Sequence, residues 1–196
     1  MKTFKDFFTE QKEKYVILLP GGYKPPTKGH MYMIESYNDN PLVHKVIVLI
    51  GPKEREGVTR NHSLQIFNLY GINKLHKVVI EDTKLDNPMV AGFDFVEKDP
   101  RAEEYKGMIF GLGASNKGDD AIRAEKLVDY FNKNPNRLRP EFRVAVPPII
   151  NALEEDGNAV SATDLRRAIR ETDVNTIRHL IPSGVSAKDF ISIFNK

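Results

Sequence analysis

The chain has 196 residues, of which 40% are hydrophobic and 29% charged, and its formal net charge is only +2. This composition predicts one soluble domain with a substantial core. Because the net charge is small, the protein has no overall positive field of the kind that favours nucleic-acid binding. No cysteine is present, which excludes disulfides and thiolate metal sites. No apolar run approaches the roughly 20 residues that cross a bilayer. We therefore expect a cytoplasmic protein with neither nucleic-acid nor membrane partners.

The first segment, 1–14, carries three phenylalanines at helical spacing, Phe4, Phe7 and Phe8, separated mostly by polar and charged residues. This pattern predicts an amphipathic extension, and it lacks the continuous apolar stretch of a secretory signal. The remaining residues, 15–196, are expected to form a single domain.

Short apolar runs alternate with helix-compatible stretches along most of the chain. The runs are rich in Val, Ile, Leu or Phe, as strands are, and the first two are apolar almost throughout, as expected for strands covered on both faces. Alternation of this kind predicts an α/β fold with an open parallel sheet of about five strands and helices on both faces. The expected strands are 15–20, 45–51, 76–81, 106–113 and 143–148, and the expected helices are 29–39, 61–71, 88–98 and 119–132.

Beyond the last expected strand, apolar residues recur at helical spacing between 165 and 180 and again between 190 and 194. We expect a helical C-terminal part that folds onto the sheet. The least regular segment, 81–105, is a candidate substrate loop or lid.

The loop after the first expected strand reads "GGYKPPTKGH", residues 21–30. Ligands of open α/β sheets bind at the carboxyl ends of the strands, so this loop is well placed for a binding site. Gly21 and Gly22 would let backbone N–H groups approach an anion, and the two prolines would stiffen the loop. Gly29 and His30 fall near a helix start, where the helix dipole favours a phosphate. The loop also carries two cations and a hydroxyl, from Lys24, Lys28 and Thr27.

A second polar stretch, "VSATDLRR", occupies residues 160–167. Ser161 or Thr163 can cap the helix that follows, and Arg166 can form charge-assisted hydrogen bonds to a phosphate. The two stretches together predict a phosphate site.

These two stretches resemble the motifs of the nucleotidyltransferase (cytidylyltransferase-like) superfamily. The first loop is similar to G-x-F-x-P-x-[H/T]-x-G-H, and the second to I-S-S-T-x-x-R. The matching positions are Gly21, Tyr23 (for Phe), Pro25, Thr27, Gly29, His30, Ser161, Thr163 and Arg166, whereas Ala162 departs from the commoner serine. The S-x-T-x-x-R-R form of the second motif is most like the nicotinamide mononucleotide adenylyltransferases.

The resemblance implies a Rossmann-like enzyme that transfers AMP from ATP to a phosphorylated small molecule such as nicotinamide mononucleotide, with release of pyrophosphate. Its partners would be a nucleoside triphosphate and that acceptor, and Mg²⁺ would arrive with the nucleotide rather than in a metal site of the protein. The implied catalytic residues are Thr27, Lys28, His30 and Arg166. The implied nucleotide-binding residues are Gly21, Gly22, Tyr23, Lys24, Gly29, His30, Ser161, Thr163 and Arg166.

Two further loops lie at the same predicted edge of the sheet. Lys53 and Arg55 follow the second expected strand, and Gly113, Ser115 and Asn116 follow the fourth. In relatives, residues in the region of Lys53 and Arg55 meet the phosphates or the acceptor. The loop after the fourth strand could let a nucleotide approach its backbone, so all five residues are candidate acceptor-binding residues.

Three alternatives stay open. The first is a cytidylyltransferase, although the sequence contains no R-T-x-G-x-S-T-S pattern, and the second is a pantetheine-phosphate adenylyltransferase, which Thr27 supports. The third is a nucleotide-binding sensor or scaffold that keeps the fold without turnover. The sequence also leaves open the base, the acceptor and the number of subunits, a homo-oligomer included.

Overall fold

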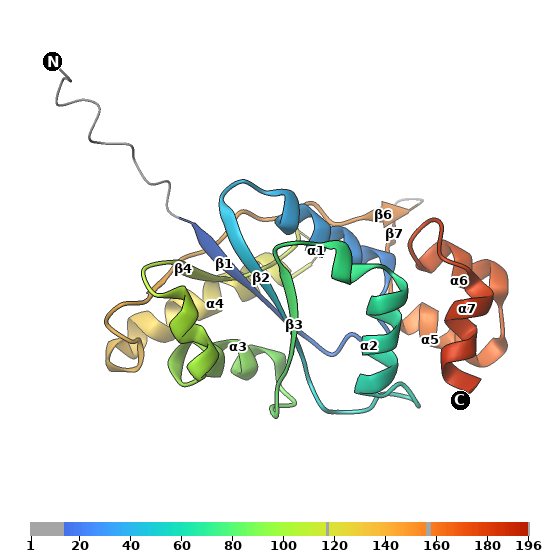
Figure 1. The fold of residues 1–196 in the computed structure, drawn as a ribbon, viewed down its shortest axis with the longest axis horizontal. Helices are drawn as coiled ribbons and strands as arrows, with labels where there is room; N and C mark the ends of the chain where they lie inside the picture. The colour runs from blue at the N-terminus through green and yellow to red at the C-terminus, as the bar shows by residue number, and fades with distance from the viewer. Residues whose placement is uncertain (1–13, 117, 156–157, 196) are drawn as a thin grey trace, which may run out of the picture.

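Five parallel strands form the centre of the molecule in the order β3-β2-β1-β4-β5 (Figure 1). The computed structural model describes residues 14–116, 118–155 and 158–195, so nearly all of the expected N-terminal extension lies outside the described residues. The predicted α/β fold and its parallel sheet are confirmed. The strand bounds are β1 Tyr15–Gly21, β2 Val43–Ile50, β3 Val78–Asp82, β4 Ile109–Leu112 and β5 Arg143–Val144.

The strand order reverses at β1, which pairs with β2 on one side and with β4 on the other. The first two crossovers therefore run one way and the third runs back to the opposite side of β1. The crevice at such a switch point, outside the carboxyl ends of the two strands, is where open α/β sheets bind ligands. The first loop leaves β1 at this point.

Four helices cover the two faces of the sheet, as predicted. Residues alternate along β1, so that Ile17 and Leu19 pack towards one pair of helices while Val16 and Leu18 pack towards the other. The first pair is α1 Lys28–Asp39 and α2 Arg60–Leu69, and the second is α3 Pro88–Glu97 and α4 Asp120–Lys133. Short 3-10 turns follow α2, α3 and α4 at Ile72–Lys74, Pro100–Tyr105 and Pro135–Arg137.

The C-terminal part is helical but packs on α2 rather than on the sheet. Its core cluster surrounds Phe190 and includes Ile66 of α2, and Figure 1 places these helices beyond α2, at the far end from the N-terminus. The expectation that they fold onto the sheet is therefore wrong. They are α5 Ala162–Glu171, α6 Val174–Leu180, α7 Ala187–Ser192 and the 3-10 turn Ile193–Asn195. A small antiparallel pair, β6 Glu154–Glu155 and β7 Asn158–Ala159, precedes them.

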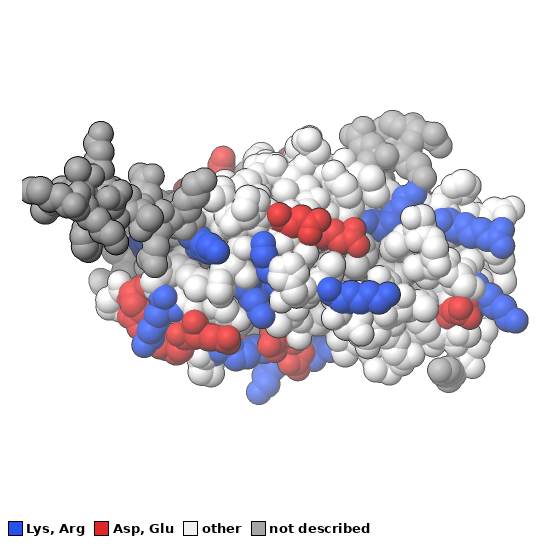
Figure 2. Space-filling model, turned by 45° about the horizontal axis from the view of Figure 1, so that its top comes forward, with Lys and Arg blue, Asp and Glu red and all other residues white. Residues whose placement is uncertain are grey.

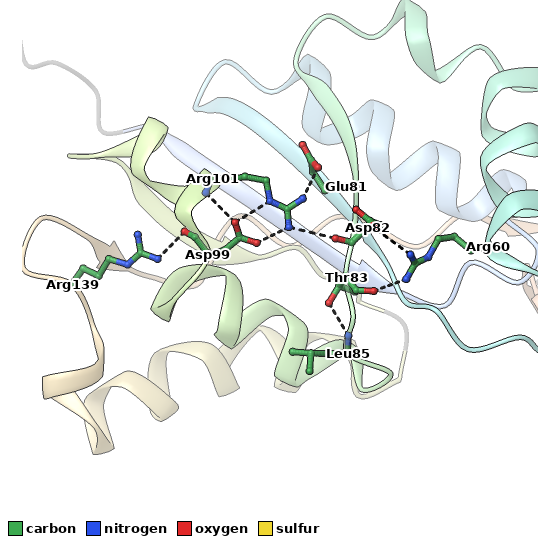
Figure 3. A network of polar contacts seen from close by, with 8 residues as sticks. All are labelled: Arg60, Glu81, Asp82, Thr83, Leu85, Asp99, Arg101 and Arg139. Carbon is green, nitrogen blue, oxygen red and sulfur yellow. Dashed lines mark hydrogen bonds and ion pairs between the residues drawn. The ribbon is translucent and has the colours of Figure 1, made fainter.

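The segment 81–105, expected to be irregular, is largely helical and is tied to β3 by an ionic network (Figure 3). The Arg101 guanidinium binds the carboxylates of Glu81 and Asp99, each at 2.5 Å, and the carbonyl of Asp82 at 3.4 Å. Arg139 donates to the Asp99 carbonyl at 2.8 Å. These bonds hold the segment in a defined place beside the sheet.

The surface carries charges of both signs. Figure 2 shows one face on which acidic and basic side chains lie intermixed, in keeping with the net charge of +2. Among the described helices, none combines the length and the apolar character needed to cross a membrane.

Candidate functional site

The start of α1 fixes the orientation and the tautomer of His30. Thr27 is the N-cap: its Oγ1 accepts from the His30 N–H at 3.4 Å, and His30 Nδ1 accepts from the Thr27 N–H at 3.0 Å. This reciprocal arrangement is a capping box with histidine in the third helical position. Because Nδ1 acts as an acceptor, the neutral ring carries its proton on Nε2. The outer edge of the imidazole is therefore a hydrogen-bond donor.

Tyr23 supports the imidazole from behind. Its ring meets that of His30 edge-on, with centroids 5.0 Å apart, and its buried hydroxyl donates to the Leu19 carbonyl at 2.8 Å. A Cβ at Gly21 would lie 2.7 Å from Tyr23 Cε2, so only glycine fits there. The hydroxyl of Tyr23 is thus engaged in the fold, and the ring is what Tyr23 offers to the site.

Two cavities meet at His30. The larger, of about 480 Å³, lies at the carboxyl ends of β1 and β4, where the strand order reverses, and its wall includes Met89 and Arg123. The smaller, of about 130 Å³, lies on the side of Thr27, Gly29 and Val160. Three described residues line both cavities, namely His30, Met33 and Asp120.

The two motifs are in contact, although 142 positions separate Lys24 from Arg166. Arg166 Nη1 donates to the Lys24 carbonyl at 2.9 Å, and Nη2 donates to Thr163 Oγ1 at 3.0 Å. A Cβ at Gly29 would lie 3.4 Å from Val160 Cβ, so the two segments also pack closely. Ser161 caps α5, accepting from the Thr163 N–H at 3.2 Å, as the sequence predicts.

Arg166 and Lys24 do not face the cavities, contrary to expectation. Arg166 is only 5% exposed, it lines neither cavity, and its Nε donates to the Glu56 carboxylate at 2.9 Å. Lys24 is 4% exposed, and its Nζ donates to the carbonyls of Gly22 and Gly51, both at 3.0 Å. Burial, with a contribution from the Arg60 guanidinium, lowers the pKa of Lys24 to about 8. Both cations therefore shape the first loop from inside.

Other predicted residues are distributed unevenly around His30. Lys28 lines a separate cavity of about 360 Å³ that it shares with Glu35 and Arg178. Lys53 and Arg55 are exposed on the loop after β2 and line neither of the two cavities at His30. None of these three cations therefore lines either cavity at His30.

The loop after β4 does reach the site. Gly113 lines the larger cavity and Ser115 the smaller one. The side chain of Asn116 accepts from the Ala152 N–H at 2.7 Å and donates to Asn151 at 3.3 Å, so it holds a wall of the smaller cavity.

Sequence reasoning missed Asp120, although it lines both cavities. Its carboxylate accepts from the Ser115 hydroxyl at 3.0 Å and from Arg123 Nη1 at 2.8 Å. An aspartate in the first turn of a helix is ordinarily explained by the helix dipole, which hides any further role. The sequence signal that could have identified Asp120 was its position five residues after Ser115, which lies in the loop after a central strand.

A second capping box shows what makes His30 different. Thr59 and His62 form the same arrangement at the start of α2, with His62 Nδ1 accepting from the Thr59 N–H at 3.2 Å. The His62 ring, however, packs against Phe194 with centroids 5.1 Å apart, and it lines neither cavity. His62 is therefore a matched structural counterpart of His30.

The C-terminal helices also support the first loop. The Tyr70 hydroxyl donates to the Pro26 carbonyl at 3.1 Å, and the Tyr70 ring stacks on Phe190, with centroids 6.3 Å apart and planes inclined by 9°. Burial raises the pKa of the Tyr70 hydroxyl far above its usual range. This hydroxyl therefore stays protonated and keeps its bond to the loop.

Gly113→Ala is expected to destabilise the protein by about 1–3 kcal/mol, the cost of overpacking a filled core. A Cβ there would lie 2.4 Å from Leu19 Cδ2, 2.8 Å from Ile17 Cγ2 and 2.9 Å from Tyr37 Cε2. Urea unfolding measures the change. Gly22→Ala is the control, because its Cβ would meet only Lys24 Cγ at 3.9 Å. Equal effects for the two variants would contradict the packing role of Gly113.

Comparison with known proteins supports the fold. No protein-family model and no curated protein matches the chain. Among solved structures, the Plasmodium falciparum nicotinic acid mononucleotide adenylyltransferase complexed with APC is 20% identical, with a TM-score of 0.60 over 93% of this chain and 96% of that one. The same Plasmodium enzyme complexed with NaAD is 17% identical, with a TM-score of 0.58 and the same coverage.

A bifunctional NMN adenylyltransferase/ADP ribose pyrophosphatase from Francisella tularensis, complexed with AMP and Mn ion, is 16% identical, with a TM-score of 0.56. The match covers 93% of this chain and 51% of that protein. The chain thus has the fold of mononucleotide adenylyltransferases, as the motif resemblance implied.

Proposed function

We propose that the protein is a nucleotidyltransferase that transfers AMP from ATP to a phosphorylated pyridine nucleotide and releases pyrophosphate. The observation that carries this proposal is the position of His30, which lines both cavities at the switch point of the sheet and whose Nδ1 accepts from the Thr27 N–H, so that the neutral ring carries its proton on Nε2. A reaction between two bound nucleotides needs such a donor at the boundary between them.

The two cavities suggest where each reactant binds. The larger one combines apolar side chains such as Met33, Met89 and Leu112 with the polar pair Asp120 and Arg123, which suits a flat ring joined to a sugar phosphate. We assign the acceptor to it. The smaller cavity adjoins Thr27, Gly29 and Val160, and so lies beside the contact between the two motifs. We assign the ATP side of the reaction to this region.

In the proposed reaction, a phosphate oxygen of the acceptor attacks the α-phosphorus of ATP in line. One P–O bond forms, the bond to the bridging oxygen breaks, and pyrophosphate leaves with the electron pair. The protein contributes mainly positioning and stabilisation of negative charge. His30 Nε2 donates to a phosphate oxygen, Thr27 holds the imidazole, and the backbone N–H groups of the first loop and of the α1 start face the phosphates.

The residues described fit a metal ion that enters with the nucleotide. Within the described part of the chain, no group of three His, Asp or Glu side chains is arranged to hold a metal. Mg²⁺ usually keeps several waters and binds one or two carboxylates together with substrate phosphates, and Asp120 lies close enough to the cavities to serve as one. Mg²⁺ supplies charge neutralisation on the triphosphate.

A nicotinate or nicotinamide mononucleotide is the preferred acceptor, because the structural neighbours carry those activities in their names. The test is a thermal-shift screen of ATP, CTP, GTP and UTP with Mg²⁺, since a ligand selective for the folded state raises its melting temperature. The nucleotide that stabilises most is then assayed for pyrophosphate release with both pyridine mononucleotides, phosphopantetheine and flavin mononucleotide.

We expect ATP with a pyridine mononucleotide to give steady pyrophosphate release. Release from CTP would identify a cytidylyltransferase, and release with phosphopantetheine would identify the pantetheine-phosphate branch. Saturable binding without release from any pair would identify a sensor or scaffold.

A further inference from the structure

The turn after β2 presents a carboxylate to the second motif. Residues 55–58 form a tight turn closed by a bridge between Arg55 and Val58, with positive φ at Glu56 (50°) and at Gly57 (80°). Two consecutive left-handed residues are the backbone of a type I′ turn, which favours glycine and tolerates few other residues. Glu56 therefore adopts a backbone conformation that is uncommon for a residue other than glycine, and this conformation positions its side chain.

Glu56 binds two arginines that lie one turn apart on α5. Its Oε1 accepts from Arg166 Nε at 2.9 Å, and its Oε2 accepts from Arg170 Nη1. The hydrogen bond from Arg166 is the main cause that lowers the pKa of the Glu56 carboxyl, so this group stays ionised. A pair of guanidinium groups holding two oxygens of one anion is equally suited to a phosphate.

Arg166 is anchored by groups other than Glu56 as well. It donates to the Lys24 carbonyl and to Thr163 Oγ1, and it is only 5% exposed. The Glu56 side chain, by contrast, is 44% exposed and reaches the pair from a solvent-facing turn. Of the two partners, the carboxylate is therefore the one that can move away.

We propose that Glu56 is an intramolecular competitor that occupies the anion position of Arg166 and Arg170 until a polyphosphate displaces it. The inference rests on the proposed function in one respect, namely that the displacing anion is the polyphosphate of the nucleotide or the pyrophosphate product. On displacement, the Nε–H of Arg166 and the Nη1–H of Arg170 exchange a carboxylate oxygen for a phosphate oxygen, while Glu56 becomes hydrated. Glu56 thus lowers the affinity for the polyphosphate.

The test is calorimetric titration of inorganic pyrophosphate, and separately of ATP with Mg²⁺, into the wild type and Glu56→Gln. Removing the competing charge is expected to tighten pyrophosphate binding at least about fivefold, because charge-assisted bonds to the two arginines no longer have to be broken first. The control is Glu54→Gln, which removes a charge from the same exposed loop. This control is expected to change the affinity by less than about twofold, as distant surface charges do.

Unchanged or weaker binding by Glu56→Gln would overturn the inference, because it would mean that Glu56 holds Arg166 in its binding position. Failure of both proteins to bind pyrophosphate would overturn it as well. Arg170→Gln in the Glu56→Gln background should reverse the gain, and a persistent gain would contradict the assignment of the anion position. Tighter pyrophosphate binding without any pyrophosphate release from ATP would leave this inference standing and would remove the proposed catalysis.

Discussion

Replacing His30 with alanine is expected to lower the rate of pyrophosphate release by at least about 100-fold, the usual effect of removing one preorganised donor from a transition state. His30 lines both cavities, and the bond that its Nδ1 accepts leaves the proton of the neutral ring on Nε2. The variant also loses one side of the α1 capping box, which costs about 1 kcal/mol of stability. Steady-state assays at saturating ATP and acceptor, with a parallel thermal melt, measure both effects.

Two further variants separate the donor from the cap. His30→Asn can keep an acceptor near the Nδ1 position while it lacks an N–H at the Nε2 position. His30→Gln can supply the distant N–H and can also keep the cap, because glutamine is a usual third residue of a capping box. We expect the asparagine variant to melt near the wild type and to be slow, and the glutamine variant to recover part of the rate. His62→Ala removes the equivalent cap from α2 and should leave the rate within about threefold. A fast His30→Ala enzyme would refute the role of His30.

Replacing Phe190 with alanine is expected to cost about 3–5 kcal/mol of unfolding free energy, the range for deleting a large buried aromatic side chain. Phe190 is fully buried at the centre of the cluster that joins α5, α6 and α7 to α2, and it contacts the rings of Tyr70 and Phe194. The deleted ring leaves a cavity that the surrounding helices can fill only in part. Urea denaturation followed by circular dichroism gives the free energy.

The companion variant is Val174→Ala, which truncates an exposed residue of the same helical region. It is expected to change stability by about 0.5 kcal/mol or less. If Phe190→Ala lost no more than this, the C-terminal cluster would not be a cooperative part of the fold.

The sheet and the helices on its faces could be predicted because their residues follow simple periods. Four helices lie within about two residues of the expected ranges, and the first two strands read as continuous apolar runs. The fifth strand was expected at 143–148, but it pairs with β4 only over Arg143–Val144. Pro147 and Pro148, in the rest of the expected range, have no N–H to donate. The spacing of apolar residues could not show that the C-terminal helices pack on α2. It identifies the buried face of a helix but not the element that this face contacts.

The sequence predicted the helix starts of the candidate site but not the directions in which its cations point. His30, Thr27 and Ser161 occupy helix starts that local sequence determines, and the two motifs do come together. The directions of the cationic side chains were harder to predict, because a lysine or arginine in a loop can turn outward to a ligand or inward to a carbonyl. Lys24 and Arg166 turn inward, and the choice depends on Gly51 and Glu56, which are distant in sequence. Asp120 was missed for another reason, because an aspartate in the first turn of a helix is ordinarily explained by the helix dipole.

The bond from Tyr70 to the Pro26 carbonyl, with Phe190 behind it, has a consequence for genetics. A screen for inactive variants should recover substitutions throughout α6 and α7, although those helices supply no wall to either cavity at His30. Such alleles would resemble defects of catalysis in a cell-based assay. Purification and refolding at low temperature would separate them from true active-site alleles. Such variants would weaken the packing that supports the loop after β1, and they would leave the residues of the site unchanged.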